Sequence, residues 1–211
     1  MGGGSVPSAG MPPTLWRVED IRIWSVGHSN HEVESFLALV AGASIEVVAD
    51  VRSQPSSRFS PQFNRQPLRQ ALTGRGIRYV FLGRELGGRP PEAGFYDDEG
   101  HVLYGEVARS ERFREGLQRL VESASKFRVA MLCSEEDPTN CHRRLLLARV
   151  LSEQGVTVEH IRGTAAILSE ERLRELIGQA RQDALFERED GVWRSTQSVS
   201  PSIRPRTSSR A

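Results

Sequence analysis

Side chains that can do chemistry stand directly after several short apolar runs of this sequence. In an open parallel sheet, ligands bind beyond the carboxyl ends of the strands, so residues that follow strands are expected to line one edge. The sequence therefore predicts a polar site on that edge. Its candidate residues fall in four groups: His28, Ser29 and Asn30; Asp50 and Arg52; Glu85, Gly87 and Gly88; and Cys133, Glu135, Cys141, His142 and Arg143.

The acid–base groups of this predicted site suit a hydrolytic enzyme. Glu85 and Glu135 are the candidate general bases, because a carboxylate in a partly desolvated rim can activate water near neutral pH. His28 and His142 are expected to hold or protonate the leaving group, since imidazole changes charge close to neutral pH. For the two carboxylates, simple solvation at the surface remains the alternative.

The remaining site residues are assigned to substrate binding or to local structure. Arg52 and Arg143 are expected to bind phosphate, and Asp50 either takes part in catalysis or pairs with Arg52. The other predicted substrate-binding residues are Ser29, Asn30, Gly87 and Gly88.

Only two cysteines occur, which excludes a disulfide-rich scaffold, and both are expected to be reduced thiols. Cys133 ends an apolar run and is interpreted equally well as a small core residue or as a nucleophile. Cys141 and His142 could join Cys133 or His28 around a metal. Their spacing is not a usual zinc pattern and a fourth ligand is missing, so no metal site is predicted and the cofactor is left open.

The elements that must position these residues alternate between short β-branched runs and amphipathic stretches, the pattern of βα units. It predicts an α/β fold, a three-layer sandwich around a mainly parallel sheet of about five strands. The expected strands are 21–26, 45–49, 77–82, 127–133 and 156–161. The expected helices are 33–40, begun by an Asn30 cap, 64–72, begun by an Asn64 cap, 106–123, 141–154 and 169–181, and the long loop between 83 and 104 is expected to be functional.

Composition sets the domain boundaries and the class of protein. The 211 residues are expected to form a flexible N-terminal segment at 1–20, one α/β domain at 21–193 and a flexible Arg, Ser and Pro-rich tail at 194–211. No apolar run approaches the length of a membrane span, and the first residues do not form a secretory signal. A cytoplasmic protein without membrane contact is therefore expected.

Four groups of motifs, taken in order, resemble the domain of unknown function 488 family. They are SVGHSN at 25–30, VADVR at 48–52, LGGR at 86–89, and LCSE at 132–135 with CHRR at 141–144. The similarity covers roughly residues 21–161. It implies an α/β fold and a site on these motifs, but it names no reaction.

A more distant similarity connects the chain with rhodanese-like domains, in the order of Asp50 and Arg52 after one strand and Cys133 after another. In those domains the amides of a cysteine loop cradle an anion. Here Glu135, Glu136 and Asp137 occupy the corresponding turn. Carboxylates there repel an anion and raise the pKa of a thiol, which disfavours sulfur transfer and phosphatase chemistry.

The charge of the whole chain identifies no partner, because 28 basic residues face 27 acidic ones. Two loops instead interleave arginine with aromatic residues, a mixture suited to phosphates and unpaired bases. We therefore expect a hydrolytic enzyme that acts on a nucleotide or on a base in nucleic acid. The alternatives are a thiol-dependent enzyme that uses Cys133 with Cys141 as the resolving thiol, and a non-catalytic module that binds nucleic acid or protein. The loop residues are Arg52, Arg58, Phe59, Phe63 and Arg65, and Arg84, Arg89, Phe95 and Tyr96.

Overall fold

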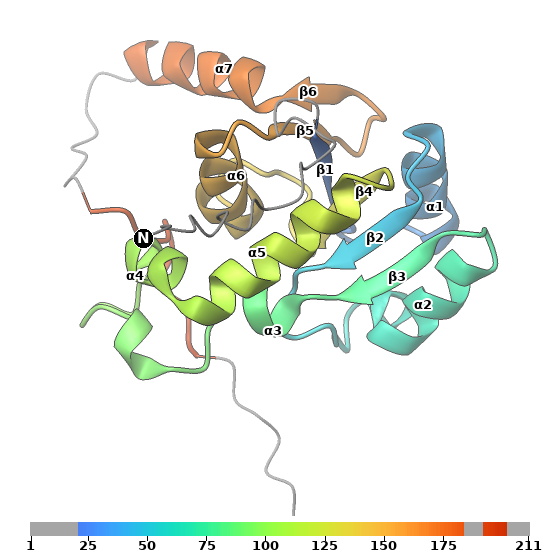
Figure 1. Ribbon diagram of the computed structural model, residues 1–211. Helices are drawn as coiled ribbons and strands as arrows, with labels where there is room; N and C mark the ends of the chain where they lie inside the picture. The colour runs from blue at the N-terminus through green and yellow to red at the C-terminus, as the bar shows by residue number, and fades with distance from the viewer. Residues whose placement is uncertain (1–20, 184–191, 202–211) are drawn as a thin grey trace, which may run out of the picture.

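A six-stranded sheet forms the centre of the computed structural model, which describes residues 21–183 and 192–201. The strand order is β3-β2-β4-β1-β5-β6, and every neighbouring pair is parallel except β5 and β6 (Figure 1). The strands are β1 (Arg22–Gly27), β2 (Val47–Asp50), β3 (Arg78–Phe81), β4 (Val129–Cys133), β5 (Thr157–Ile161) and β6 (Ile167–Ser169). The expected mainly parallel sheet is confirmed, with one strand more than about five.

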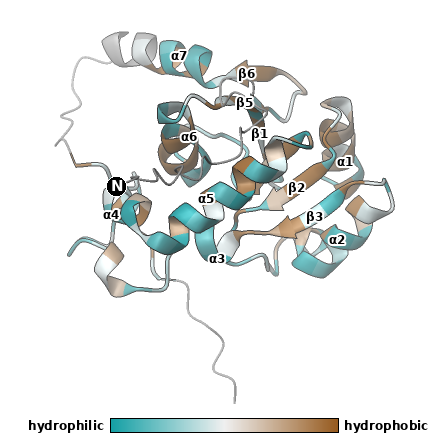
Figure 2. Ribbon diagram, viewed as in Figure 1, coloured by the Kyte–Doolittle hydropathy of each residue, from teal (hydrophilic) through white to brown (hydrophobic). Residues whose placement is uncertain are grey.

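Helices cover both faces of this sheet, which makes the molecule a three-layer α/β sandwich. On one face, α1 (Val33–Gly42) and α2 (Arg65–Thr73) pack on Trp24, Val26, Val48 and Leu132. On the other face, α4 (Tyr104–Arg109), α5 (Glu111–Ala124) and α6 (Arg149–Glu153) pack on the opposite side chains of the same strands. Figure 2 shows brown on much of β2 and β3 and teal on much of α5 and α2, as expected for amphipathic helices over an apolar sheet.

Shorter elements complete the chain between these layers. Single helical turns form at η2 (Pro61–Phe63), α3 (Gly83–Leu86) and η3 (Ala93–Phe95). A π-helical segment, η4 (Arg143–Ala148), runs directly into α6, and α7 (Glu170–Asp183) follows β6 and contacts β5 and β6. A π-helical turn is rare and often marks a functional site.

Four of the expected helices differ from the sequence expectation for local reasons. The expected helix 106–123 is two helices, because Ser110 ends α4 and caps α5 by accepting a hydrogen bond from the Phe113 amide. The expected helix 141–154 begins as the π-helical segment. Asn30 does not cap α1, because Glu32 stands at its N-cap position. Asn64 does stand at the N-cap position of α2, but its side chain accepts a hydrogen bond from the Ser57 amide and not from an amide of the helix.

The C-terminal boundary also differs from the expectation of a flexible tail from residue 194. Residues 194–199 pair with the loop after η3: Ser195 exchanges hydrogen bonds with Val102, and the Val199 amide donates to the Gly100 carbonyl. Packing against a loop distant in sequence therefore orders a polar segment. Residues 1–20 and 202–211, also expected to be flexible, lie outside the described residues. Within the described part of the chain, no helix is long and apolar enough to span a membrane.

Burial at the sheet centre predicts a large difference between two isoleucine-to-alanine substitutions. Ile23 in β1 is fully buried, whereas Ile167 in β6 is 45% exposed. We expect Ile23→Ala to lower the free energy of unfolding by about 2–5 kcal/mol, because it leaves a cavity in a close-packed core. Urea denaturation should show a loss below about 1 kcal/mol for Ile167→Ala. Equal losses would contradict the described burial.

Candidate functional site

Strand register brings three chain segments to one point at the carboxyl edge of the sheet. Because β4 lies between β1 and β2, the His28 amide donates to the Cys133 carbonyl at 3.1 Å, and the Val51 amide donates to the Leu132 carbonyl at 3.0 Å. The residues that follow β1, β2 and β4 are therefore neighbours. The approach is close at Gly27, where a Cβ would lie 1.7 Å from the Glu135 carbonyl oxygen.

A buried ion pair occupies the β2 side of this edge. Arg52 donates to both carboxylate oxygens of Asp50, from Nε at 2.9 Å and from Nη2 at 2.6 Å, and the Tyr79 hydroxyl donates to Asp50 at 2.6 Å. Both charged side chains are buried. The carboxylate and the guanidinium thus neutralise each other inside the protein, and Tyr79 joins the site from β3, although the sequence did not mark it.

His28 is held as a neutral imidazole beside this pair. Arg52 Nη1 donates to His28 Nε2 at 3.0 Å, so the ring proton lies on Nδ1, which donates to the Ser29 carbonyl at 2.6 Å. The ring stacks on Phe63 with the centroids 4.3 Å apart. Burial, together with the positive charge of Arg52, lowers the pKa of His28 to about 4. Ser29 takes a left-handed backbone conformation, with φ of 44°, to close this turn.

Two cysteines and a histidine form a compact cluster next to the ion pair. His142 Nδ1 lies 3.7 Å from the sulfur of Cys133 and 3.7 Å from that of Cys141. The other ring nitrogen, Nε2, lies 3.1 Å from the Val51 carbonyl and donates to it. Gly88 packs against this ring so closely that a Cβ would lie 2.7 Å from the His142 Cγ. All three residues are buried.

The thiols of this cluster differ in their affinity for a proton. The hydrogen bond that Cys133 donates to Cys141, together with burial, raises the pKa of Cys133 well above its usual value. The same hydrogen bond, helped by the positive charge of Arg143, holds the pKa of Cys141 well below its usual value. Of the two thiols, Cys141 therefore gives up its proton more readily.

Arg143 is fully buried at the start of the π-helical segment. Its guanidinium donates to Cys141 Sγ at 3.3 Å, to Ser25 Oγ at 3.2 Å and to the carbonyls of Glu135 and Glu136. None of these partners is a carboxylate. The positive charge of Arg143 is balanced by the dipoles of these partners and by the sulfur of Cys141. The hydrogen bonds of this guanidinium therefore go to groups of the protein itself.

A buried relay that sequence analysis missed continues from Arg143. Ser25 Oγ donates to His160 Nδ1 at 2.7 Å, and His160 Nε2 donates to Glu170 at 2.8 Å. Glu170 also pairs with Arg144 at 3.2 Å. The sequence does contain a signal for this relay, because Ser25 and His160 stand within otherwise apolar strands. A buried polar side chain requires a hydrogen-bond partner, so the two residues indicate a polar contact inside the sheet.

Comparison with known protein families identifies the family of this chain. Residues 32–150, more than half of the chain, match the family described as domain of unknown function DUF488. The protein belongs to the DUF488 family. The matched region contains the Asp50–Arg52 pair and the cysteine–histidine cluster, whereas β1 with His28 precedes it. Neither the curated proteins nor the solved structures contain a match.

Several predicted residues of this DUF488 protein lie outside the contacts described above. Glu85 points to α5, where it pairs with Arg119 at 2.8 Å, because α3 turns it away from the strand ends. The residues Glu135 and Asn30 are exposed, and Glu135 contributes only its carbonyl to Arg143. Gly87 is packed under Ser53, whose hydroxyl accepts a hydrogen bond from the Arg89 amide.

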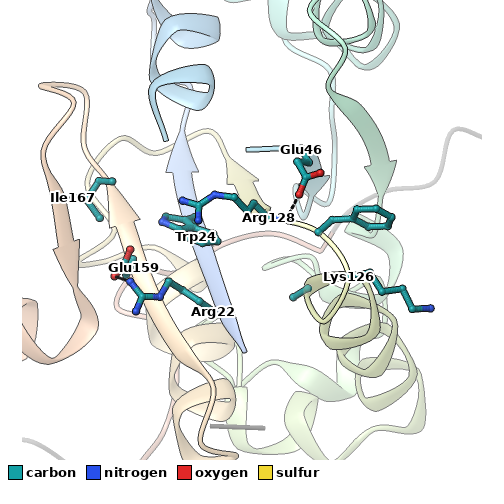
Figure 3. A pocket seen from close by; sticks show the side chains of 9 residues that line it. Arg22, Trp24, Glu46, Lys126, Arg128, Glu159 and Ile167 are labelled. Carbon is teal, nitrogen blue, oxygen red and sulfur yellow. Dashed lines mark hydrogen bonds and ion pairs between the residues drawn. The ribbon is translucent and has the colours of Figure 1, made fainter. Parts of the chain in front are cut away.

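A hollow at the opposite, amino end of the sheet is not part of this site (Figure 3). Both of its arginines already have partners: Arg22 pairs with Glu159 at 2.5 Å, and the Arg128 guanidinium donates to the Ala43 carbonyl and lies over the Trp24 ring. The DUF488 motifs lie at the other end of the strands.

The neutral state of His28 predicts a loss of stability in acid. The unfolded chain takes up the proton near pH 6.5 and the folded chain only near pH 4, so stability falls as the pH drops through this window. We expect His28 to contribute a loss of about 2 kcal/mol between pH 7.5 and pH 5. Urea denaturation at both values should show a smaller loss in His28→Gln. An unchanged pH dependence in that variant would contradict the description.

The buried ion pair predicts graded losses of stability. Asp50→Asn leaves the Arg52 charge buried without its anion, and we expect about 3–5 kcal/mol of destabilisation. Tyr79→Phe removes one hydrogen bond to Asp50 and should cost about 1–3 kcal/mol. Glu153→Gln, which breaks an exposed pair with Arg149, is the control and should cost less than about 1 kcal/mol. Thermal or urea unfolding that ranks the three differently would refute the assignment.

Proposed function

We propose that this DUF488 protein is an enzyme that acts on single-stranded nucleic acid, with hydrolysis of a base or nucleotide as its reaction. The observation that carries the proposal is one segment of the chain. From residue 51 to residue 84 the sequence contains seven arginines and no aspartate or glutamate. This segment, called here the arginine face, has the charge needed to attract a phosphate backbone.

Most cations of the arginine face are accessible. The exposed arginines of this segment are Arg58, Arg65, Arg69, Arg75, Arg78 and Arg84. Within the described residues, only Arg75 among these six pairs with a carboxylate, that of Glu34. Arg65 and Arg78 lie over aromatic rings, an arrangement that leaves the positive charge free for an anion. A guanidinium group that has no anionic partner can bind a phosphate through two hydrogen bonds.

An exposed aromatic ring accompanies these cations. Phe59 is 82% exposed, and the Arg58 guanidinium lies 4.7 Å from its ring centroid. An apolar ring held at the surface is a platform on which an unpaired base can stack, which favours a single strand over a duplex.

Part of the arginine face lies directly beside the strand-end site. Phe63, which lies within it, stacks on His28, and Gln62 donates to the His31 carbonyl. Farther out, Arg65, Gln66, Arg69, Gln70 and Thr73 of α2 line an open hollow. A single strand of nucleic acid bound along α2 and Phe59 would therefore approach the buried polar cluster.

The roles within the proposed reaction differ from the initial expectation. Arg52 is paired with Asp50, and Arg143 donates to carbonyls and Cys141, so we assign phosphate binding to the outer arginines instead. The carboxylates of Glu85 and Glu135 make no hydrogen bond to the cluster among the described residues. The proposed hydrolysis therefore needs another group to activate water.

Binding of a fluorescent single-stranded oligonucleotide tests the proposed surface. Phe59→Ala should weaken binding by about 5- to 150-fold, the loss of one stacked base. The double variant Arg65→Gln/Arg69→Gln should reduce the slope of log affinity against log salt by about 1.4, since each phosphate contact contributes about 0.7 on single strands. Arg172→Gln, which changes an arginine paired with Glu175 on α7, is the matched control.

The same experiment separates the possible outcomes. Equal binding by all the variants and the wild type, or binding insensitive to salt, would refute the arginine face as the nucleic-acid surface. Mass spectrometry of the oligonucleotide after incubation tests turnover. A released base or a cleaved product supports an enzyme, and binding without any product over a wide panel of sequences contradicts it in favour of a binding module.

A further inference from the structure

Three ligand atoms at the strand-end site are arranged as a metal would require. The sulfurs of Cys133 and Cys141 and a ring nitrogen of His142 all lie within 4.8 Å of one another. From this arrangement we propose that Cys133, Cys141 and His142 bind one zinc ion through three protein ligands, with the fourth position open. The site stands on its own geometry; its use to activate water rests on the function proposed above.

The distances within the cluster match those of a tetrahedral zinc site. With Zn–S bonds of about 2.3 Å and a Zn–N bond of about 2.05 Å, a tetrahedral angle places each sulfur about 3.6 Å from the nitrogen. Both sulfurs lie 3.7 Å from His142 Nδ1. The ligand atoms therefore need to move little to receive the ion.

The histidine is oriented as a metal ligand. Its Nε2 donates to the Val51 carbonyl at 3.1 Å, which leaves the lone pair of Nδ1 directed at the two sulfurs. A ligating histidine typically donates its second ring nitrogen to a carbonyl or carboxylate in this way. Gly88 packs against the ring and restricts its rotation, since even a Cβ at Gly88 would collide with it.

The charge around the sulfurs favours the metal-binding form. The guanidinium of Arg143 is fully buried and has no carboxylate among its hydrogen-bond partners. A buried cation is costly unless an anion compensates it, and Cys141 Sγ, 3.3 Å from Nε, is the partner able to carry a negative charge. An N–H group that donates to a zinc-bound thiolate is also an ordinary outer contact of such sites.

The number of ligands distinguishes this site from a structural zinc site. Structural sites use four protein ligands, whereas catalytic sites use three and keep the fourth position for water or substrate. Among the described residues, the cluster contains three ligand side chains and no fourth cysteine, histidine or carboxylate. Zinc lowers the pKa of a bound water to about 7, which would provide the activated water that Glu85 and Glu135 are not placed to provide.

Metal analysis of the reduced full-length protein tests the site directly. We expect one zinc per chain after dialysis against metal-free buffer, and one cobalt per chain with the intense near-ultraviolet absorption of thiolate ligands after exchange. Zinc should also protect both thiols from a thiol reagent until a strong chelator is added. These measurements use the wild-type protein, so they do not depend on the folding of a variant.

Substitutions then assign the ligands. Cys133→Ser, Cys141→Ser and His142→Asn should each weaken zinc binding by at least about 10- to 100-fold in competition with a chelating dye, the loss expected even for an outer contact. His101→Gln is the control, because His101 belongs to a separate cluster with Asp97 and Glu99 and should leave the affinity unchanged. Circular dichroism checks that each variant is folded.

Several results would overturn the metal site. They are a reduced wild-type protein that binds less than about one tenth of an equivalent of zinc, bound cobalt without thiolate absorption, and equal zinc affinity in the His142 variant and the wild type. The two proposals fail separately. A protein that binds zinc but no oligonucleotide refutes the proposed function alone, and one that binds oligonucleotide but no zinc refutes the metal site alone.

Discussion

The buried guanidinium of Arg143 is the constraint around which the strand-end site is organised. A charge removed from water must be surrounded by acceptors, and this one draws them from β1, from the turn after β4 and from the residue two positions before it. It thereby fixes Ser25, Cys141 and the 135–136 backbone relative to one another. The Asp50–Arg52 pair performs the same task on the β2 side, and His28 stays neutral between the two arginines.

The arginines of the strand-end site and of the arginine face fall into two sets, an inner set that is buried and an outer set that is exposed. The inner arginines hold the site together and have few donors left for a ligand. The outer arginines of the 51–84 segment are exposed, and among them only Arg75 pairs with a carboxylate of the described residues. In the function proposed above, the outer set would recognise the nucleic acid and the inner cluster would carry the chemistry, so that the two tasks fall to neighbouring parts of the chain.

Much of the fold could be predicted from the sequence, because βα alternation and strand burial are local patterns. The grouping of His28, Asp50, Arg52, Cys133 and His142 followed from the rule that parallel strands end at one edge, and their hydrogen bonds connect them there. Glu85 was misplaced because a single helical turn decides its direction, and no periodicity exists over four residues. Ser25 and His160 lie within strands, so a search confined to strand ends could not find them. The edge strand β6 is three residues long, too short for a pattern.

Whether the cysteine–histidine cluster binds metal is the central claim, and X-ray absorption at the zinc edge of the purified reduced protein tests it most directly. The account predicts two sulfur neighbours at about 2.3 Å and two nitrogen or oxygen neighbours at about 2.0–2.1 Å, one from His142 and one at the open position. A zinc shell made only of nitrogen and oxygen, or one with four sulfurs, would contradict it.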